Sequence, residues 1–184
     1  MKNIVTLCKT LLVSTGLCLL SIPGTYAVVS AQPARLLSAM TTYNEVSAWE
    51  ATYYFTLTVP ASATDSLQQV ALTQIQGLEA IRFNSQESFA FEGKGETADK
   101  LARRGQKLGI TLADSKNQPR TVIVSFAQPV APGKTIIIGL KPFRNPMYDG
   151  VYQFQVQTLS TGKSTYNPII GTARLQFYGV DAHE

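Results

Sequence analysis

The residues best suited to chemistry lie in one short stretch, 141–152, between two predicted strands. It offers a guanidinium, an amide, a phenol ring and a carboxylate that a sugar or a peptide could contact: Arg144, Asn145, Tyr148 and Asp149. Two prolines, an asparagine before proline and an Asp-Gly pair predict a specific loop conformation here. The alternative is a structural loop held shut by its own side chains, with Arg144 paired to Asp149 and Tyr148 packed on the edge of the fold.

A second group of charged residues lies in the segment Thr97–Leu108. Its basic residues are spaced to share one face of a short helix: Lys100, Arg103, Arg104 and Lys107. Such a face predicts a small anion-binding patch for an acidic polysaccharide or a lipid headgroup. The alternative is a solvated loop or short helix that covers an edge of the domain.

Most catalytic chemistries are disfavoured by residue type. The only histidine is His183, beside the C-terminus, where chains usually fray, so neither a Ser-His-Asp arrangement nor a zinc site is expected. His183, Met40 and Met147 are too few and too scattered for a copper site. We therefore expect no metal, no cofactor and no enzymatic activity.

Glycoside hydrolysis is the enzymatic alternative, because it requires only two carboxylates facing each other across a cleft. The candidates lie beside turns or in polar segments, where any soluble domain carries charge: Glu79, Glu87, Glu92 and Asp149.

The first 31 residues have the order of a secretory signal peptide: basic residues Lys2 and Lys9, an apolar run over 11–22, and small residues up to Ala31. The run has about a dozen residues, short of the roughly 20 that span a bilayer, so no transmembrane segment is expected after cleavage. Cleavage is predicted after Ala31, with an earlier site near Ala27 as the alternative. The protein is predicted to be exported, to the periplasm or beyond the cell.

Cleavage would also change the chemistry of the chain, because Cys8 and Cys18 would leave with the signal peptide. The mature domain would then have no thiol chemistry and no disulfide. The 16 Lys and Arg residues lose Lys2 and Lys9, leaving 14 against 12 Asp and Glu. A nearly neutral domain is not expected to bind nucleic acid.

Alternating apolar and polar residues predict an all-β domain that would position the 141–152 loop. The alternation is clearest over 51–59, 151–158 and 171–178, and two β-branched runs, 121–126 and 135–140, are predicted to pair as a hairpin. About seven or eight short strands favour a single immunoglobulin-like β-sandwich over residues 49–180, preceded by an N-terminal arm over 32–48 and including one short helix.

Several of these segments resemble an uncharacterised family of exported cyanobacterial proteins, a domain of unknown function. The resemblance spans roughly residues 50–178, and its most specific part is the Arg-Asn-Pro-x-Tyr-Asp-Gly-Val-Tyr run that starts at Arg144. The segment 95–108 departs from the family pattern and resembles a variable insertion. The resemblance implies export and a compact β domain in the cell envelope or outside it, and it brings no catalytic residues.

The sequence thus predicts a non-enzymatic protein of the cell envelope or the medium, with a binding or structural role and the 141–152 loop as its contact surface. The expected partner is an envelope polysaccharide or another envelope protein. A carbohydrate-active enzyme with a carboxylate pair and a polyanion-binding accessory module are the alternatives.

Overall fold

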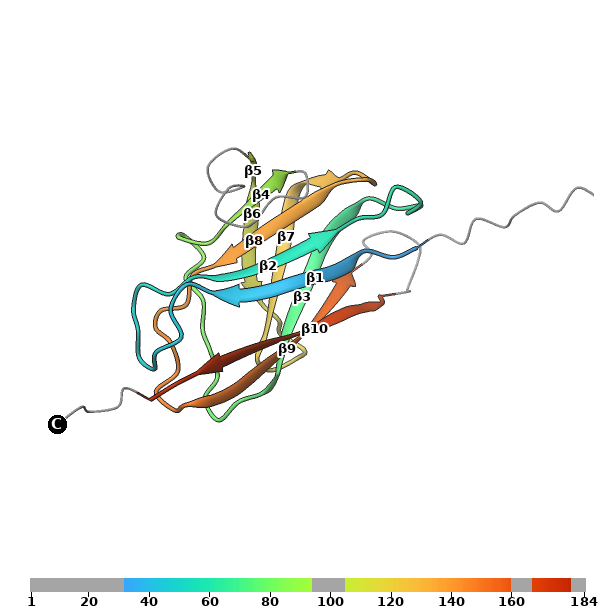
Figure 1. Cartoon of the computed structure of the whole chain (residues 1–184). Helices are drawn as coiled ribbons and strands as arrows, with labels where there is room; N and C mark the ends of the chain where they lie inside the picture. Colours follow the sequence, from blue (N-terminus) through green and yellow to red (C-terminus); the bar gives the residue numbers. More distant parts are fainter. Residues whose placement is uncertain (1–31, 94–104, 160–166, 180–184) are drawn as a thin grey trace, which may run out of the picture.

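The computed structural model describes residues 32–93, 105–159 and 167–179, and these form a sandwich of two five-stranded antiparallel sheets (Figure 1). Sheet 1 has the order β1 (Arg35–Thr41), β2 (Tyr53–Thr58), β8 (Thr135–Leu140), β4 (Phe89–Gly93), β5 (Gln106–Leu108). Sheet 2 has the order β10 (Ile169–Phe177), β9 (Gly150–Leu159), β3 (Leu67–Gln76), β7 (Thr121–Val130), β6 (Ile110–Asp114). The all-β sandwich is as predicted, but it has ten strands rather than seven or eight.

Two details of the prediction are wrong within the described residues, and a third segment is more regular than expected. The described residues contain no helix, and residues 106–108 of the predicted helical segment form β5. The predicted hairpin does not form, since β7 pairs with β3 and β6 whereas β8 pairs with β2 and β4. The prolines and Gly133, with φ of 83°, instead carry the chain from one sheet to the other. Residues 35–41, in the range expected for the N-terminal arm, form β1.

The period-two pattern determines which side chains fill the space between the sheets. In β2, Tyr53, Phe55 and Leu57 are fully buried, and in β9 Tyr152, Phe154 and Val156 are buried opposite them. Rings meet across the layers, as where Phe55 lies 5.9 Å from Phe154 in an edge-on contact. Burial of these apolar side chains stabilises the fold at roughly 25 cal/mol per Å² removed from water.

Strand β8 is apolar on both faces, which explains why it lacks the alternation of its neighbours. Ile137 points away from the core yet is only 1% exposed, because it packs with Tyr54 in a second apolar cluster on the outer face of sheet 1. On that face the Phe89 ring lies where a side chain at Gly139 would be. The Phe89 ring also contacts Tyr54 and Phe91, with centroids 6.1 and 5.3 Å apart.

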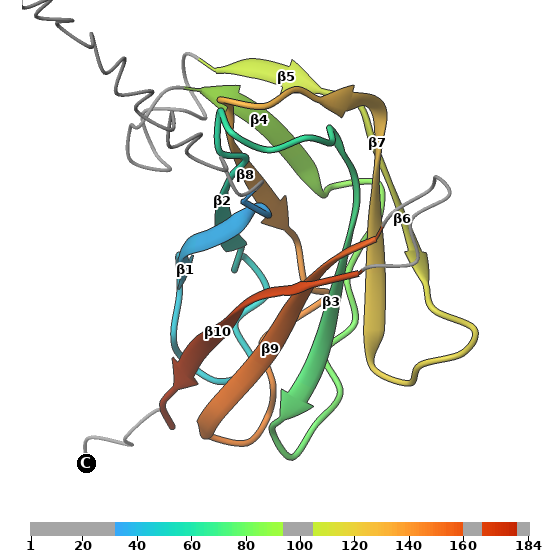
Figure 2. The same ribbon diagram turned by 90° about the vertical axis from the view of Figure 1, so that its right-hand side faces the viewer.

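The two sheets approach each other along both edges of the sandwich, but by different connections, as the turned view shows (Figure 2). On one side β5 and β6 are separated only by Gly109, so the chain passes directly from sheet 1 into sheet 2. On the other side β1 and β10 lie against each other, and Gly171 has no room for a Cβ because Leu36 fills that space. Both β1 and β10 run toward the same end of the sandwich, where Glu45 and Tyr178 form a parallel bridge.

Candidate functional site

Three loops that carry exposed apolar side chains meet at that end of the sandwich, which we call the loop end, and the loop between β6 and β7 (115–120) lies beside them, because the Arg120 guanidinium donates to the Gly77 carbonyl. The three loops connect β1 to β2 (residues 42–52), β3 to β4 (77–88) and β8 to β9 (141–149), and Tyr178 after β10 joins them. The predicted 141–152 loop therefore lies at the centre of a larger surface built from segments far apart in the sequence.

Asn145 is the buried centre of the loop end and is 0% exposed. Its Oδ1 accepts a hydrogen bond from the Tyr53 hydroxyl at 2.8 Å, and its Nδ2 donates to the carbonyls of Tyr43 and Glu45 at 3.1 and 2.8 Å. Its backbone N–H donates to the Ala48 carbonyl at 2.8 Å. Asn145 thus joins the core strand β2, the 42–52 loop and the 141–149 loop, and it has no accessible surface with which to contact a ligand.

Arg144 is also occupied within the fold, although its partner is not Asp149 as expected. Its Nη2 donates to Oε1 of Glu79 at 2.8 Å, and Oε2 of the same carboxylate accepts the backbone N–H of Met147 at 2.7 Å. Glu79 therefore fastens the 77–88 loop to the 141–149 loop from both sides of its carboxylate.

The other two predicted contact residues face outward. Tyr148 is 53% exposed and Asp149 is also exposed. The Tyr148 carbonyl accepts a hydrogen bond from the Tyr152 hydroxyl at 3.1 Å. This bond fixes the backbone at Tyr148, while the Tyr148 side chain is exposed to solvent. The structure thus divides the predicted set into residues that hold the loop, Arg144 and Asn145, and residues that are accessible, Tyr148 and Asp149.

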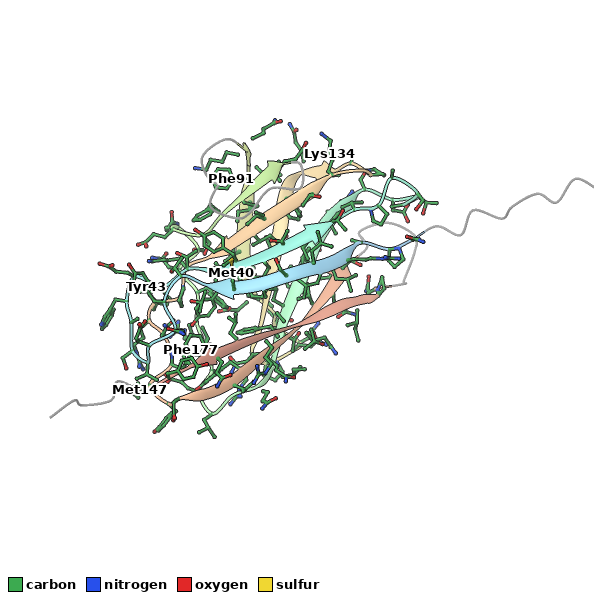
Figure 3. All side chains as sticks on the ribbon, in the orientation of Figure 1. Met40, Tyr43, Phe91, Lys134, Met147 and Phe177 are labelled. Atoms are coloured by element: carbon green, nitrogen blue, oxygen red, sulfur yellow. The ribbon has the colours of Figure 1, made fainter. Side chains whose placement is uncertain are left out.

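The loop end displays a group of large apolar side chains, of which only Tyr148 was among the predicted contact residues. Among the described residues, eleven large apolar side chains are exposed, and seven of these lie on the loop end. We call these seven the apolar cap: Tyr43, Trp49, Leu78, Phe143, Met147, Tyr148 and Tyr178. The labelled Tyr43 and Met147 mark this end of the molecule in Figure 3.

Hydrogen bonds between backbones join the segments that carry the apolar cap. Ser47 donates to the Pro146 carbonyl at 3.0 Å, Phe143 to the Arg82 carbonyl at 3.1 Å, and Val46 to the Tyr178 carbonyl at 2.9 Å. The Arg82 guanidinium also lies 5.9 Å from the centre of the Phe143 ring. Single apolar side chains scattered over a surface are ordinary, but a group held in place on one end is typical of an interaction site.

Most of the predicted basic patch lies outside the described residues. Lys107 is exposed on β5, whereas Lys100, Arg103 and Arg104 lie outside the described residues, as does His183. Of the proposed acids, Glu92 pairs with Lys134 and Glu87 accepts a hydrogen bond from Asn84 at 3.0 Å. Within 32–93, 105–159 and 167–179, no three His, Cys, Asp or Glu residues gather as metal ligands would, and no helix is long and apolar enough to cross a membrane.

Burial raises the pKa of the Tyr53 hydroxyl far above its usual value of 10, and Tyr152 and Glu79 raise it further. An acid whose pKa is raised by folding stabilises the native state below its unfolded pKa, and this contribution is lost as the pH rises above it. The unfolding free energy should therefore fall above pH 10. The fall should be shallower in Tyr53→Phe by about 1.4 kcal/mol per pH unit. Denaturant unfolding between pH 8 and 12 measures this, and parallel pH profiles would contradict it.

Comparison with known proteins gives a family. A family model described as "Protein of unknown function (DUF2808)" matches residues 26–177. No curated protein matches the chain.

Solved structures that match the chain include BslA, a bacterial hydrophobin, at 19% identity and a TM-score of 0.42, covering 81% of this chain and 96% of that one. They also include ACE19, the collagen-binding subdomain of an Enterococcus faecalis surface protein, at 10% identity and 0.36, covering 68% and 87%. The fimbrial subunit MyfA of Yersinia enterocolitica follows at 9% and 0.35, covering 79% and 98%. All three TM-scores lie below 0.5, and we draw no conclusion about this chain from these matches.

Proposed function

We propose that this chain, which belongs to the DUF2808 family of proteins of unknown function, is an exported, non-enzymatic binding protein that attaches to a component of the cell envelope through its apolar cap. The observation that carries the proposal is the concentration of exposed apolar side chains on the interlocked loops of one end. Contact with a partner would remove the apolar surface of each cap residue from water, and this removal is favourable.

In the 141–149 loop some side chains hold the backbone in place and others are exposed, and this separation supports binding through the cap. The polar side chains best suited to specific recognition, Arg144 and Asn145, are engaged by Glu79, Tyr53 and the 42–52 loop. These contacts fix the backbone from which Phe143, Met147 and Tyr148 project, so these side chains are presented in a fixed arrangement. A surface ordered before binding loses less conformational entropy when its partner arrives.

A triple variant, Phe143→Ser/Met147→Ser/Tyr148→Ser, tests the proposal. Each of these side chains is 53% exposed, and the hydrogen bonds of Phe143, Met147 and Tyr148 reported above use their backbone atoms, which the substitutions keep. We expect purified variant protein to bind envelope fractions at least about tenfold more weakly, because about 1.4 kcal/mol of lost apolar contact is sufficient for that. Co-sedimentation with envelope fractions measures the change, and thermal unfolding verifies that the variant is folded.

The matched control is Leu37→Ser/Met40→Ser/Ile169→Ser. It removes three side chains with similar exposure, 56, 53 and 57%, from β1 and β10 rather than from the loop end. The control should bind as the wild type does. Equal losses in both triple variants would show that general hydrophobicity governs binding, and the cap would then have no special role.

A further inference from the structure

The apolar cap combines chemical features that together specify a class of partner. We infer that the cap docks onto the surface of a lipid bilayer whose headgroups carry no net charge, and that its side chains insert at the boundary between headgroups and acyl chains. The inference rests on the proposed function and names the partner of the same surface.

The residue types of the cap are those that partition to a bilayer interface. Trp49 and the tyrosines Tyr43, Tyr148 and Tyr178 carry a ring with one polar atom, which suits a layer that is apolar on one side and wet on the other. Leu78, Phe143 and Met147 have no group that hydrogen-bonds strongly, and they supply area for the acyl region. Leu78 and Trp49 are the most exposed of all, at 77 and 71%.

A polysaccharide fits this surface less well than a lipid does. Sugar hydroxyl groups require hydrogen-bonding side chains beside the rings. At the loop end two of the four side chains predicted to contact a partner are not available, since the guanidinium of Arg144 is bound by Glu79 and the amide of Asn145 is 0% exposed. Asn44, Glu50 and Asp149 remain exposed there, so the preference for lipid rests mainly on the area of the apolar cap. A partner without a defined pattern of polar groups does not need hydrogen-bonding side chains.

The charges around the cap favour a neutral lipid over an anionic one. The three loops and the adjoining 115–120 loop contain five basic residues, Arg82, Lys116, Arg120, Lys141 and Arg144, of which Arg144 is paired with Glu79. They contain five acidic residues: Glu45, Glu50, Glu79, Glu87 and Asp149. Attraction to anionic lipid needs an excess of Lys and Arg near the surface, and here the basic and acidic residues are equal in number.

The shape of the cap also fits a deformable surface. Its members belong to three separate loops and to the end of β10, and backbone hydrogen bonds hold these segments in one arrangement. Lipid can fill the spaces between separate projecting side chains, whereas a rigid protein partner would need a matching set of cavities.

The single tryptophan of the chain provides the test, because Trp49 is itself in the cap. We propose titrating purified protein with phosphatidylcholine vesicles while recording Trp49 fluorescence. The emission maximum should shift to shorter wavelength, and lipids brominated near the headgroup end of the acyl chain should quench the emission more than lipids brominated near the terminal methyl. Replacing a third of the phosphatidylcholine with phosphatidylglycerol should leave the partition coefficient unchanged or lower it.

The same two triple variants supply the matched comparison, since both retain Trp49. Phe143→Ser/Met147→Ser/Tyr148→Ser should lower the partition coefficient at least about tenfold, and Leu37→Ser/Met40→Ser/Ile169→Ser should not change it. A blue shift that depends on protein concentration without lipid would mean that a second copy covers the cap, and this overturns the inference. Binding that requires the anionic lipid overturns it as well.

The inference and the proposed function can fail separately. One outcome is that the cap variant loses binding to envelope fractions while wild-type protein does not bind vesicles of any composition. The cap is then a binding surface for another partner, and the lipid inference is wrong. If envelope binding is insensitive to the cap variant, the proposed function fails first, and the lipid inference fails with it.

Discussion

Replacing Asn145 with alanine should lower the unfolding free energy by about 4 kcal/mol, which corresponds to a fall of roughly 10 °C in Tm for a domain of this size. The side chain is 0% exposed and makes three hydrogen bonds. Alanine would leave the buried Tyr53 hydroxyl without its acceptor and the carbonyls of Tyr43 and Glu45 without a donor. It would also leave a cavity where the amide was.

A double-mutant cycle with Tyr53→Phe separates this hydrogen bond from general disruption. Each single change removes the bond between the Tyr53 hydroxyl and Oδ1 of Asn145, so the double variant should be at least about 1 kcal/mol more stable than the sum of the two losses predicts. The exposed neighbour Asn44→Ala is the control and should change stability by less than about 0.5 kcal/mol. Strict additivity in urea unfolding would mean that the bond contributes nothing.

The second large effect is expected at Gly77, the residue between β3 and the cap residue Leu78. Its φ of 123° lies in a region that side chains rarely adopt, and an added Cβ would come within 2.1 Å of the buried ring of Tyr152. Backbone strain and overpacking should together make Gly77→Ala about 4 kcal/mol less stable.

Two other glycines separate the strain from the clash. Gly150 has a φ of 126° but nothing within 4 Å of an added Cβ, so Gly150→Ala should show the strain alone, about 1 to 2 kcal/mol. At Gly139 no unusual φ occurs, but the Cβ would meet the Phe89 ring at 2.4 Å, and Gly139→Ala should show the clash with a ring that is partly free to move. Chemical denaturation of the three variants gives the comparison, and a Gly77 variant no worse than the Gly150 variant would show that the Tyr152 ring yields without cost.

The strands with one wet face could be predicted from the sequence, because alternation records which face is buried. Strands β2, β9 and β10 are of this kind, and each lies where the alternation places it. Which strands pair with each other could not be predicted from the alternation. Strands β7 and β8 are adjacent and both rich in β-branched residues, but nothing local distinguishes a hairpin from a passage between sheets.

The candidate site was predicted only in part, for a physical reason. The pattern of residues 144–149 identified a well-defined loop, but the residues that engage it, Glu79, Tyr53 and the 42–52 loop, are brought in by the fold from 65 to 102 positions away. A sequence signal for the cap did exist. Trp49 and Phe143 are large apolar residues within turn-rich segments, outside any alternating strand, where a residue without a binding role would more often be polar.

The parallel course of β1 and β10 has a mechanical consequence. Arg35 begins β1 at the end opposite the loop end, and Phe177 ends β10 beside it, so the described chain enters and leaves at opposite ends (Figure 1). Tension applied between these two points would run along the strands and would slide β1 against β2 and β10 against β9. Hydrogen bonds loaded in that direction share the force and must break together. A protein gripped at the apolar cap and pulled from the start of β1 would therefore resist traction as a tether does.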